Sequence, residues 1–494
     1  MAIVGAGAVG IALAILIARQ GLQVTLVEGG PAQPPIAFRK ANRAKSTGRK
    51  HLGIAEGRMK ALGGTTRLWG GQLMPFGEGD LKGGTYPGKA AWPISPVELN
   101  AAARRALEML GIPAGLRDAT TVFRGAAGRL PAFGDQVEMA VATWLPQPDF
   151  ARLFADELAQ MPNLHVLTDH PVELLEFGSA GRCTGIRLGG TGVVEARDVV
   201  LANGTFELVG TLLRAARSEP NCGFAENPHI GRWFIDHLHA VAGTIRDIDP
   251  VALRNFSDPV LKSGHKFSVK LRLADHVQQA AAVPNAAAMV LSPLTVRELL
   301  HSLASLSHRN SKDATGPGIL RSLAMLAPLI WRYLVKRRGP GLVGDTAYLG
   351  TEVEQVLFPE SRITLDPEDP QTLVLNWAID GKPELRALRL LCERLKEDFA
   401  ELRLGVIEID PRVEREDPAF LEEFHDAYHQ MGGARMATTA ENGVVDPDLK
   451  VFGTDNLFAL GAATFPSGSF ANPTLTALAL AVRLSDTLVA RRSA

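Results

Sequence analysis

Residues 2–10 read AIVGAGAVG, and this stretch decides the fold of the chain. Three apolar residues typical of a short buried strand run into the pattern G-x-G-x-x-G at Gly5, Gly7 and Gly10, and an apolar helix is expected over residues 9–19. In such a unit the first glycine makes the tight turn, the second lets a pyrophosphate approach the backbone, and the third lets the helix pack close to the sheet. The positive end of the helix then faces the phosphates.

An acidic residue at the right distance strengthens this interpretation. Glu28 lies 18 residues after Gly10, at the end of a second strand expected over residues 23–27. A carboxylate there can accept both hydrogen bonds of an adenosine ribose diol. Strand, fingerprint, helix and acid together predict a dinucleotide-binding unit on a parallel sheet, although the fingerprint does not distinguish FAD from NAD.

The composition excludes several other classes of protein. Of the 494 residues, 46% are hydrophobic and 21% charged, as in an ordinary globular protein. With 52 basic and 53 acidic residues the net charge is −1, so a basic surface for bulk nucleic-acid binding is missing. Three cysteines without a metal-type spacing predict neither a metal site nor a secreted disulfide framework. No signal peptide precedes the first strand, so we expect a cytoplasmic location.

The most apolar internal stretch, residues 319–335, is interrupted by Arg321, Pro328 and Arg332. Its longest part without a charge is ten residues, which is too short to span a bilayer, and we expect no transmembrane segment. We interpret the stretch as a buried or substrate-capping helix. Because the basic residues 336–338 follow it directly, the alternative is a surface that contacts a membrane or an apolar partner.

The order of the expected elements predicts an α/β protein with a discontinuous nucleotide-binding domain. The pattern changes from α/β to mostly antiparallel α+β and then returns to α/β. Expected elements include a helix over 150–161, strands at 164–168, 184–188 and 199–201, long helices over 382–404 and 473–490, and inserted strands at 238–245, 267–273, 286–291, 347–357, 362–365 and 372–377. We therefore predict a Rossmann-like domain from residues 1–75, 150–237 and 425–494, and an inserted substrate-binding or cap domain, built on a mostly antiparallel sheet, from residues 76–149 and 238–424.

A second glycine cluster lies at residues 61–71, ALGGTTRLWGG, where four glycines occur within nine residues. Glycine allows the backbone to lie flat against a planar group and leaves several N–H donors free. We interpret this segment as a ligand-contacting loop; the alternative is a loop with a structural role alone.

The most specific pattern is in the C-terminal part of the chain. It comprises HQMGGARM at 429–436, GVVDPDL at 443–449 and FPSGSFANPTLT at 465–476. Together with the fingerprint, the GGTT loop and VVLANGT at 199–205, in this order, it resembles the glucose–methanol–choline (GMC) family of flavoprotein oxidoreductases. The middle of the chain, about residues 240–425, resembles that family's variable substrate domain.

The resemblance implies that the Rossmann-like domain binds FAD and that His429 is the catalytic base, with Asn472, 43 residues later, as its partner. A neutral imidazole can accept the alcohol proton while hydride passes to flavin N5, and an amide can hydrogen-bond the developing alkoxide. Some family members attach FAD covalently to a histidine where this chain has Leu68, so we expect non-covalent FAD. A second departure is Gly461, where several members have Asp.

The glycine patterns and the resemblance together predict the cofactor-binding residues. They are Gly5, Gly7, Ala8, Val9, Gly10, Glu28, Gly29, Gly63, Gly64, Thr65, Thr66, Trp69, Gly70, Gly71, Ala202, Asn203, Gly204, Gly461, Ala462, Pro473 and Thr474.

Local sequence alone allows plainer interpretations of the same residues. Asn472 and Pro473 also form an ordinary helix N-cap followed by proline at the first helical position, and His429 alone would be a structural histidine. We interpret His237 and His239 as structural residues of a strand, because no third metal ligand is evident.

The predicted function is FAD-dependent oxidation of a CH–OH group. The residue 63–69 loop and the H-x-x-G-G motif resemble the sugar- and glycoside-oxidising branches, so the predicted substrate is a sugar, glycoside or cyclic polyol. The alternatives are a hydroxynitrile-lyase-like enzyme without net redox chemistry, an oxidoreductase of a non-sugar alcohol, an NAD-dependent dehydrogenase and a catalytically idle subunit. Oxygen, a quinone and a cytochrome all stay open as electron acceptor, as does the oligomeric state.

Overall fold

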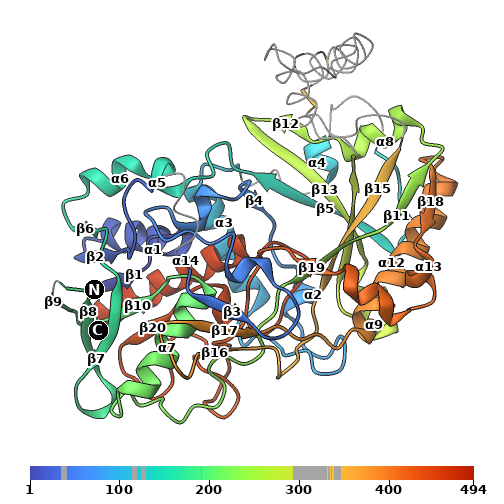
Figure 1. Cartoon of the computed structure of the whole chain (residues 1–494). Helices are drawn as coiled ribbons and strands as arrows, with labels where there is room; N and C mark the ends of the chain where they lie inside the picture. The colour runs from blue at the N-terminus through green and yellow to red at the C-terminus, as the bar shows by residue number, and fades with distance from the viewer. Residues whose placement is uncertain are drawn as a thin grey trace, which may run out of the picture.

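Two sheets, one parallel and one antiparallel, organise the molecule (Figure 1). The structure is a computed structural model and describes residues 1–34, 42–113, 119–123, 130–190, 192–292 and 346–493, together with residues 331, 334, 337 and 338. Both chain termini lie beside the parallel sheet, on the left of Figure 1, and the antiparallel sheet occupies the right. This α/β architecture confirms the predicted fold class.

The parallel sheet draws its strands from distant parts of the chain. Its order is β20-β10-β1-β2-β6, and every neighbouring pair is parallel. The strands are β1 (Ala2–Val4), β2 (Val24–Val27), β6 (Leu164–Leu167), β10 (Val199–Leu201) and β20 (Leu457–Ala459). All residues of β1, β10 and β20 are buried, as short apolar runs in a parallel sheet require.

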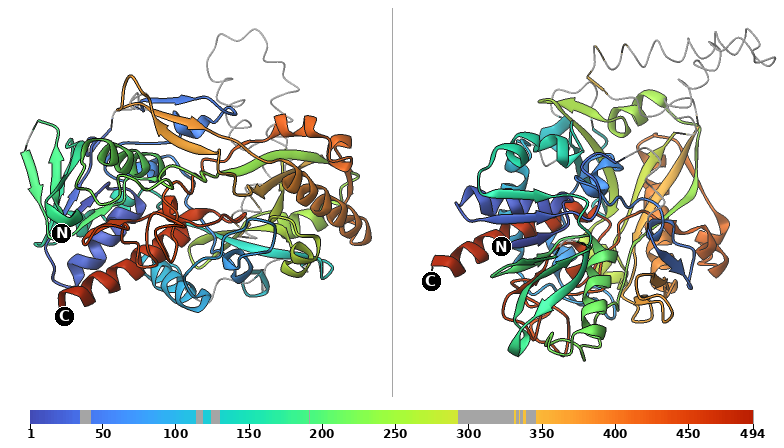
Figure 2. Two further views of the ribbon diagram at one scale, coloured as in Figure 1. Left: turned by 90° about the horizontal axis from the view of Figure 1, so that it is seen from below. Right: turned by 60° about the vertical axis from the view of Figure 1, so that its left-hand side comes forward.

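Helices cover this sheet and carry the cofactor motifs. α1 (Ala8–Arg19) begins in the fingerprint, and α14 (Pro473–Ser493) packs against both α1 and α3 (Pro96–Met109). Figure 2 shows α14, in red, running beside α1, in blue. Within the described residues, α14 alone is long and apolar enough to cross a membrane, but 67% of its apolar window is buried in the protein, as in a core helix. α7 (Thr205–Ser218) follows β10 directly.

The antiparallel sheet runs β18-β11-β15-β14-β13-β5-β4, with β12 on β13 and β19 on β11. Its strands are β4 (Gln72–Leu73), β5 (Val137–Trp144), β11 (His237–Arg246), β12 (Val260–Lys262), β13 (His265–Leu273), β14 (Ala286–Leu291), β15 (Ala347–Glu354), β18 (Val406–Ile409) and β19 (His425–Asp426). α12 (Lys382–Glu401) packs on this sheet through buried residues at helical spacing, among them Leu388, Leu391, Leu395 and Phe399.

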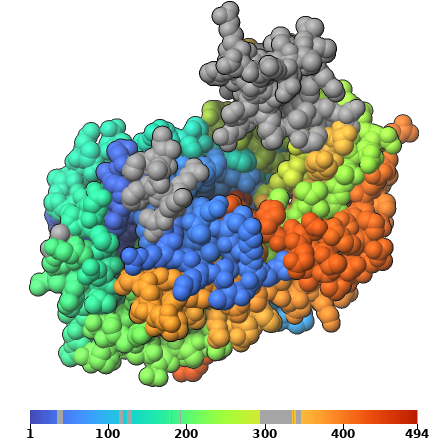
Figure 3. All heavy atoms as spheres, in the orientation of Figure 1, coloured from blue at the N-terminus to red at the C-terminus, as the bar shows by residue number. Residues whose placement is uncertain are grey.

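Two smaller sheets complete the fold. β3 (Ala44–Ser46) pairs in parallel with β17 (Leu373–Asn376), which pairs with β16 (Arg362–Leu365). In Figure 3 the blue residues that include β3 lie at the centre of the visible face, beside the orange residues of this sheet. The other small sheet is β7 (Val172–Phe177), β8 (Cys183–Leu188) and β9 (Gly192–Glu195).

Most predicted elements are present, with shifted ends. The strands expected at 199–201, 286–291 and 362–365 match β10, β14 and β16 at both ends. The helix expected over 150–161 was wrong: it is two short helices, α5 (Phe150–Leu153) and α6 (Ala155–Gln160), because Phe154 has a non-helical ψ of 28°. The helix expected over 382–404 ends at Glu401, and Arg403 then adopts a positive φ of 53°. Apart from Trp331 and Leu334, the apolar stretch 319–335 lies outside the described residues.

Candidate active site

A cavity of about 1090 Å³ opens where the carboxyl ends of the parallel strands face the antiparallel sheet. Ligand pockets typically measure about 300–1,000 Å³, so this cavity has room for a ligand of dinucleotide size. All predicted cofactor-binding residues line it except Gly10, Gly63 and Gly71, and the predicted pair His429 and Asn472 lines it as well.

The three exceptions lie in the walls without lining the cavity. A Cβ on Gly10 would lie 1.9 Å from the carbonyl oxygen of Gly5, so this glycine lets α1 pack against the first turn. Gly63 has a φ of 93°, and its N–H donates to the carbonyl of Ala6 at 2.8 Å. Gly71 has a φ of 79° beside Leu145.

Backbone, not side chains, forms the wall around the fingerprint turn. A Cβ on Gly5 would lie 2.5 Å from Cα of Asn203, and a Cβ on Gly64 would lie 2.9 Å from Cα of Gly7. A Cβ on Gly7, by contrast, would meet no protein atom within 4 Å, because this residue faces the open cavity at the N-terminus of α1. The turn is therefore a cradle for an anionic group, as a dinucleotide pyrophosphate requires.

Glu28 lies at the same end of the sheet and is 7% exposed. Its carboxylate accepts N–H hydrogen bonds from Ala6 and Gly30, each at 3.0 Å, and each oxygen keeps a second lone pair. Burial raises its pKa to about 7, although the backbone hydrogen bonds act against that shift. Glu28 thus lines the cavity, and it also holds the fingerprint turn against the end of β2.

A group of cations beside the turn was not predicted. Arg58 and Lys60 contact the Glu207 carboxylate at 3.1 and 3.0 Å, and Arg214 lies 4.0 Å from it. Although burial acts in the opposite direction, these cations lower the pKa of Glu207 to about 2. Three cations around one carboxylate leave a positive wall suited to phosphate. Arg58 and Lys60, just before the GGTT loop, were the sequence signal from which these cations could have been predicted.

His429 and Asn472 meet across the cavity wall. Asn472 Nδ2 lies 2.8 Å from His429 Nε2, which places the amide at the end of α14 against the imidazole. Asn472 is buried, and its Oδ1 has no hydrogen-bond partner among the described residues. Burial lowers the pKa of His429, and the carboxylates of Glu352 and Asp236 partly offset this shift, so the imidazole is neutral near neutral pH.

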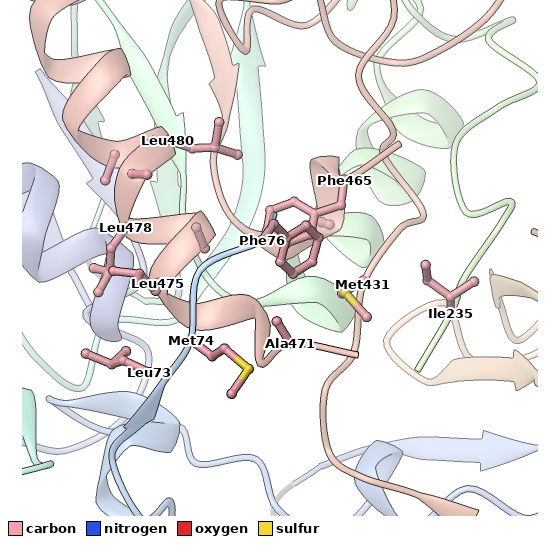
Figure 4. Close-up of a cluster of buried hydrophobic side chains, with 14 of the residues drawn as sticks. Leu73, Met74, Phe76, Ile235, Met431, Phe465, Ala471, Leu475, Leu478 and Leu480 are labelled. Atoms are coloured by element: carbon pink, nitrogen blue, oxygen red, sulfur yellow. The ribbon is translucent and has the colours of Figure 1, made fainter. Parts of the chain in front are cut away.

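An apolar cluster packs next to His429 and Asn472 in the chain. Figure 4 shows side chains from three separate segments meeting in one cluster, including Phe76, Met431, Phe465 and Ala471. Met431 also exchanges two backbone hydrogen bonds with Ile235, at 2.8 and 3.0 Å. Because Met431 follows His429 by two residues and Ala471 precedes Asn472, this cluster sets the spacing of the pair.

A buried carboxylate joins His429 to a second histidine. Asp236 Oδ1 accepts the backbone N–H groups of His237 at 2.7 Å and His429 at 2.9 Å, and its Oδ2 lies 3.1 Å from His51 Nε2. Burial would raise the pKa of Asp236, but the hydrogen bond from His51 lowers it overall. The side chains of His429 and His237 then meet through their Nδ1 atoms, 2.9 Å apart.

His51, Asp236 and Asp426 have the composition of a metal site, but their atoms are already hydrogen-bonded. Asp426 accepts the N–H groups of Leu52 and Gly53 at 2.7 and 2.8 Å. The Nδ1 of His51 accepts the N–H of Ile54 at 3.1 Å. We interpret this cluster as the anchor of the segment after β3.

A buried ion pair lies on the sheet wall of the cavity. Glu352 on β15 lines the cavity and pairs with Lys270 on β13, and both side chains are buried. Burial alone would raise the pKa of Glu352, but the Lys270 ammonium holds it at about 2. The carboxylate is therefore ionised beside His429 and His237.

We expect Glu352→Gln to destabilise the protein by about 3–5 kcal/mol near neutral pH, because it leaves Lys270 charged and unpaired. A carboxylate whose pKa is depressed from 4.5 to about 2 contributes stability above pH 4.5 and loses it as the pH falls toward 2. The deficit of the variant should therefore shrink below pH 4.5. Urea unfolding of both proteins near neutral pH and well below pH 4.5 measures this.

Glu408→Gln is the matched control, because Glu408 pairs with Arg246 at an exposed site. Its effect should be much smaller than that of Glu352→Gln. A Glu352→Gln deficit that stays constant over the acidic range would contradict an ionised, paired Glu352.

Sequence comparisons connect this chain to known flavoenzymes. Residues 358–481 match the family model described as GMC oxidoreductase, and this segment contains His429 and Asn472. A curated C-glycoside 3-oxidase of Arthrobacter globiformis is 36% identical over 152 residues, which are 29% of this chain and 27% of that protein. The alignment thus spans about a quarter of the length of that relative.

Solved structures with the same fold extend over the whole chain. Pyridoxine 4-oxidase from Mesorbium loti superposes with a TM-score of 0.58 at 17% identity, over 98% of both chains. A formate oxidase variant of Aspergillus oryzae, solved for the effect of its mutation on FAD modification, gives a TM-score of 0.55 at 15% identity, over 100% of this chain and 98% of that chain. At these identities the likeness establishes the fold.

Proposed function

We propose that the chain, whose residues 358–481 match the GMC oxidoreductase family model, is an FAD-dependent member of that family that oxidises a CH–OH group of a sugar or glycoside to the carbonyl. One observation carries the proposal: an imidazole and a carboxamide meet at 2.8 Å on the wall of a cavity that the dinucleotide fingerprint also lines.

The residues of the cavity fit FAD. The fingerprint turn and the cations around Glu207 would hold the pyrophosphate, and Glu28 would hold the adenosine ribose. The glycine loop and the N-terminus of α14 would flank the flavin. Leu68 lines the cavity and has no group that forms a bond to flavin, so we propose that FAD is bound non-covalently.

His429 is the proposed base. FAD, when bound, accepts the hydride that leaves the carbinol carbon. The hydroxyl proton goes to His429 Nε2, since a buried imidazole with a lowered pKa is neutral at working pH and one of its ring nitrogens carries a lone pair. Proton and hydride together account for the two hydrogens that an alcohol loses when it becomes a carbonyl.

Asn472 suits both protonation states of this base. Its Nδ2 donates to a bare Nε2, and rotation of the amide would present Oδ1, which has no other partner among the described residues, to an Nε2–H. The same Nδ2 can donate to an alkoxide that forms between the two side chains. The positive end of α14, at Pro473, favours negative charge at this wall.

A carbohydrate is the proposed substrate class. The curated relative is a C-glycoside 3-oxidase, and the cavity wall presents an ionised carboxylate, Glu352, of the kind that accepts hydrogen bonds from hydroxyl groups. A non-sugar alcohol is the alternative, since the fold neighbour pyridoxine 4-oxidase is not named for a sugar. We also propose the division into an FAD-binding part, residues 1–75, 150–237 and 425–494, and a substrate-binding part, residues 76–149 and 238–424.

Anaerobic mixing with a panel of sugars, O- and C-glycosides and simple alcohols tests the function. We expect the purified protein to carry a flavin absorption band near 450 nm. Since reduction of the flavin needs no added acceptor, the substrate alone should bleach this band, and a glycoside should do so faster than a simple alcohol. The measurement is the rate of bleaching in stopped flow.

Each alternative predicts a different result. A lyase would carry flavin that no alcohol bleaches, and an NAD-dependent dehydrogenase would purify without flavin. Bleaching by non-sugar alcohols alone would overturn the proposed substrate class while leaving the redox chemistry in place.

A further inference from the structure

A second histidine, His237, contacts the imidazole of the proposed base His429. His237, the first residue of β11, is completely buried, and its ring meets that of His429 edge to face, with ring centres 4.7 Å apart. The two Nδ1 atoms are 2.9 Å apart, so one of them carries the shared proton and the other accepts it. The sequence alone had predicted only a structural role for this histidine.

The proposed role of His429 as base fixes the direction of this hydrogen bond. A base that takes the alcohol proton at Nε2 is unprotonated there, so the single proton of neutral His429 is on Nδ1, and the Asn472 amide nitrogen, 2.8 Å from Nε2, can donate to that nitrogen. That proton is donated to His237 Nδ1. His237 must then carry its own proton on Nε2, a buried atom with no hydrogen-bond partner among the described residues.

Burial and the surrounding charges keep His237 neutral. Burial, His429 and the Lys270 ammonium on β13 oppose a positive charge on His237, whereas Glu352 on β15 and Asp236, just before β11, favour it. With its pKa lowered to about 3, chiefly by burial, His237 keeps one ring nitrogen as an acceptor over the working pH range.

We infer that His237 is the positioning residue of the base: it accepts the Nδ1 proton of His429 and thereby leaves Nε2 of His429 bare and directed at the substrate hydroxyl. The inference rests on the proposed function of His429. It gives His237 the role that an outer hydrogen-bond partner has for other functional histidines, which is to fix the tautomer and the ring orientation. Asp236 supports it by holding the backbone N–H groups of both histidines on one oxygen.

The same contact stabilises the product of proton transfer. When Nε2 takes the alcohol proton, the imidazolium still donates its Nδ1–H to His237. Loss of the acceptor therefore destabilises the charged form of His429 and makes Nε2 a weaker base.

The first test reads the tautomer directly and needs no substrate. In FAD-loaded protein with ¹⁵N-labelled histidines, a bare and a protonated ring nitrogen resonate in separate regions, and His429→Gln identifies the signals of His429. We expect His429 to be the Nδ1–H tautomer in the parent protein. An Nε2–H tautomer in the parent protein would overturn the inference, whether or not any glycoside reduces the flavin.

The second test compares two replacements of His237 in the FAD-loaded enzyme. His237→Leu has no acceptor, whereas His237→Asn can place its amide oxygen near the position of Nδ1. With the glycoside that bleaches the flavin fastest, we expect His237→Leu to lower kcat about 10- to 100-fold, with KM changed less than about threefold, and His237→Asn to recover most of that loss. The acidic limb of the kcat/KM profile should move to lower pH in His237→Leu, because Asp236, Glu352 and Lys270 are unchanged and only the acceptor is lost.

A structural role alone predicts another result. Both variants would then lose thermal stability and FAD content together, and the pH profile of the remaining activity would match that of the parent. That outcome, or a His237→Leu enzyme with the turnover and tautomer of the parent, overturns the inference. Failure of the proposed function is distinguishable, since it removes flavin bleaching but leaves the tautomer measurement intact.

Discussion

Replacement of His429 by alanine is expected to lower turnover about 10²- to 10⁴-fold while FAD stays bound, because general-base catalysis contributes about that factor. His429 Nε2 is the group placed to accept the hydroxyl proton, and Asn472 beside it has an amide that cannot take a proton at working pH. The cradle of the fingerprint turn is built from Gly5, Gly7 and Gly64 and does not include the imidazole. Turnover should therefore fall without a loss of bound FAD.

The measurement pairs the anaerobic rate of flavin reduction with the ratio of flavin to protein absorbance. The matched control is His165→Ala, because His165 is an exposed residue of β6 on the parallel sheet and should leave both quantities unchanged. His429→Ala leaves Asn472 and His237 without their partner, so we expect a stability loss of about 1–3 kcal/mol, which a melting curve can detect. Parent-like turnover in His429→Ala would show that another group removes the proton.

The parts of the site that the sequence predicted are those in which local chemistry forces the residue type. Gly5 and Gly64 have positive φ angles of 98° and 55°, and an added Cβ at either would collide with backbone, so the requirement for glycine is visible in the sequence itself. The same holds for the short apolar strands β1 and β10, which a parallel sheet buries on both faces. His429 and Asn472 were predicted through the resemblance, since each alone has an ordinary structural interpretation.

The parts that the sequence did not predict depend on contacts between distant segments. His237 gains its partner because β11 and the segment after β19 are joined through Asp236, 193 residues from His429. Nothing in the local sequence FIDHLH distinguishes a histidine that faces another imidazole from one that faces the core. Glu352 and Lys270 likewise meet across strands β15 and β13, which are not direct neighbours in the sheet.

The fold of residues 76–149 was missed for a related reason. α3 begins at a Ser95–Pro96 cap and packs on α14, but its buried positions are mostly alanine and its other positions are largely polar or charged, so its sequence resembles that of an ordinary surface helix. β5 pairs with β13 more than 120 residues later, and its burial does not alternate regularly along the strand. Period-2 alternation, the main signal of a half-buried strand, is therefore absent from its sequence.

Substitutions at two glycines of the fingerprint, Gly10 and Gly7, should separate the stability of the fold from FAD binding. Gly10→Ala places a methyl group 1.9 Å from the carbonyl oxygen of Gly5, which can be relieved only if α1 moves away from the sheet. Overpacking of this kind costs about 1–3 kcal/mol, and backbone on both sides of the contact favours the upper end. Gly7→Ala meets no protein atom within 4 Å, and its φ of −87° suits alanine, so the FAD-free protein should be as stable as the parent.

Gly7→Ala should instead weaken FAD binding, because its methyl group projects into the space that the pyrophosphate would occupy against the backbone. We expect the dissociation constant for FAD to rise at least about tenfold, which corresponds to about 1.4 kcal/mol. Urea unfolding of the FAD-free proteins and fluorescence titration with FAD measure the two quantities separately, and each variant serves as the control for the other. If Gly7→Ala bound FAD as tightly as the parent, the cofactor could not lie against this turn, and the position proposed for the flavin beside His429 would lose its anchor.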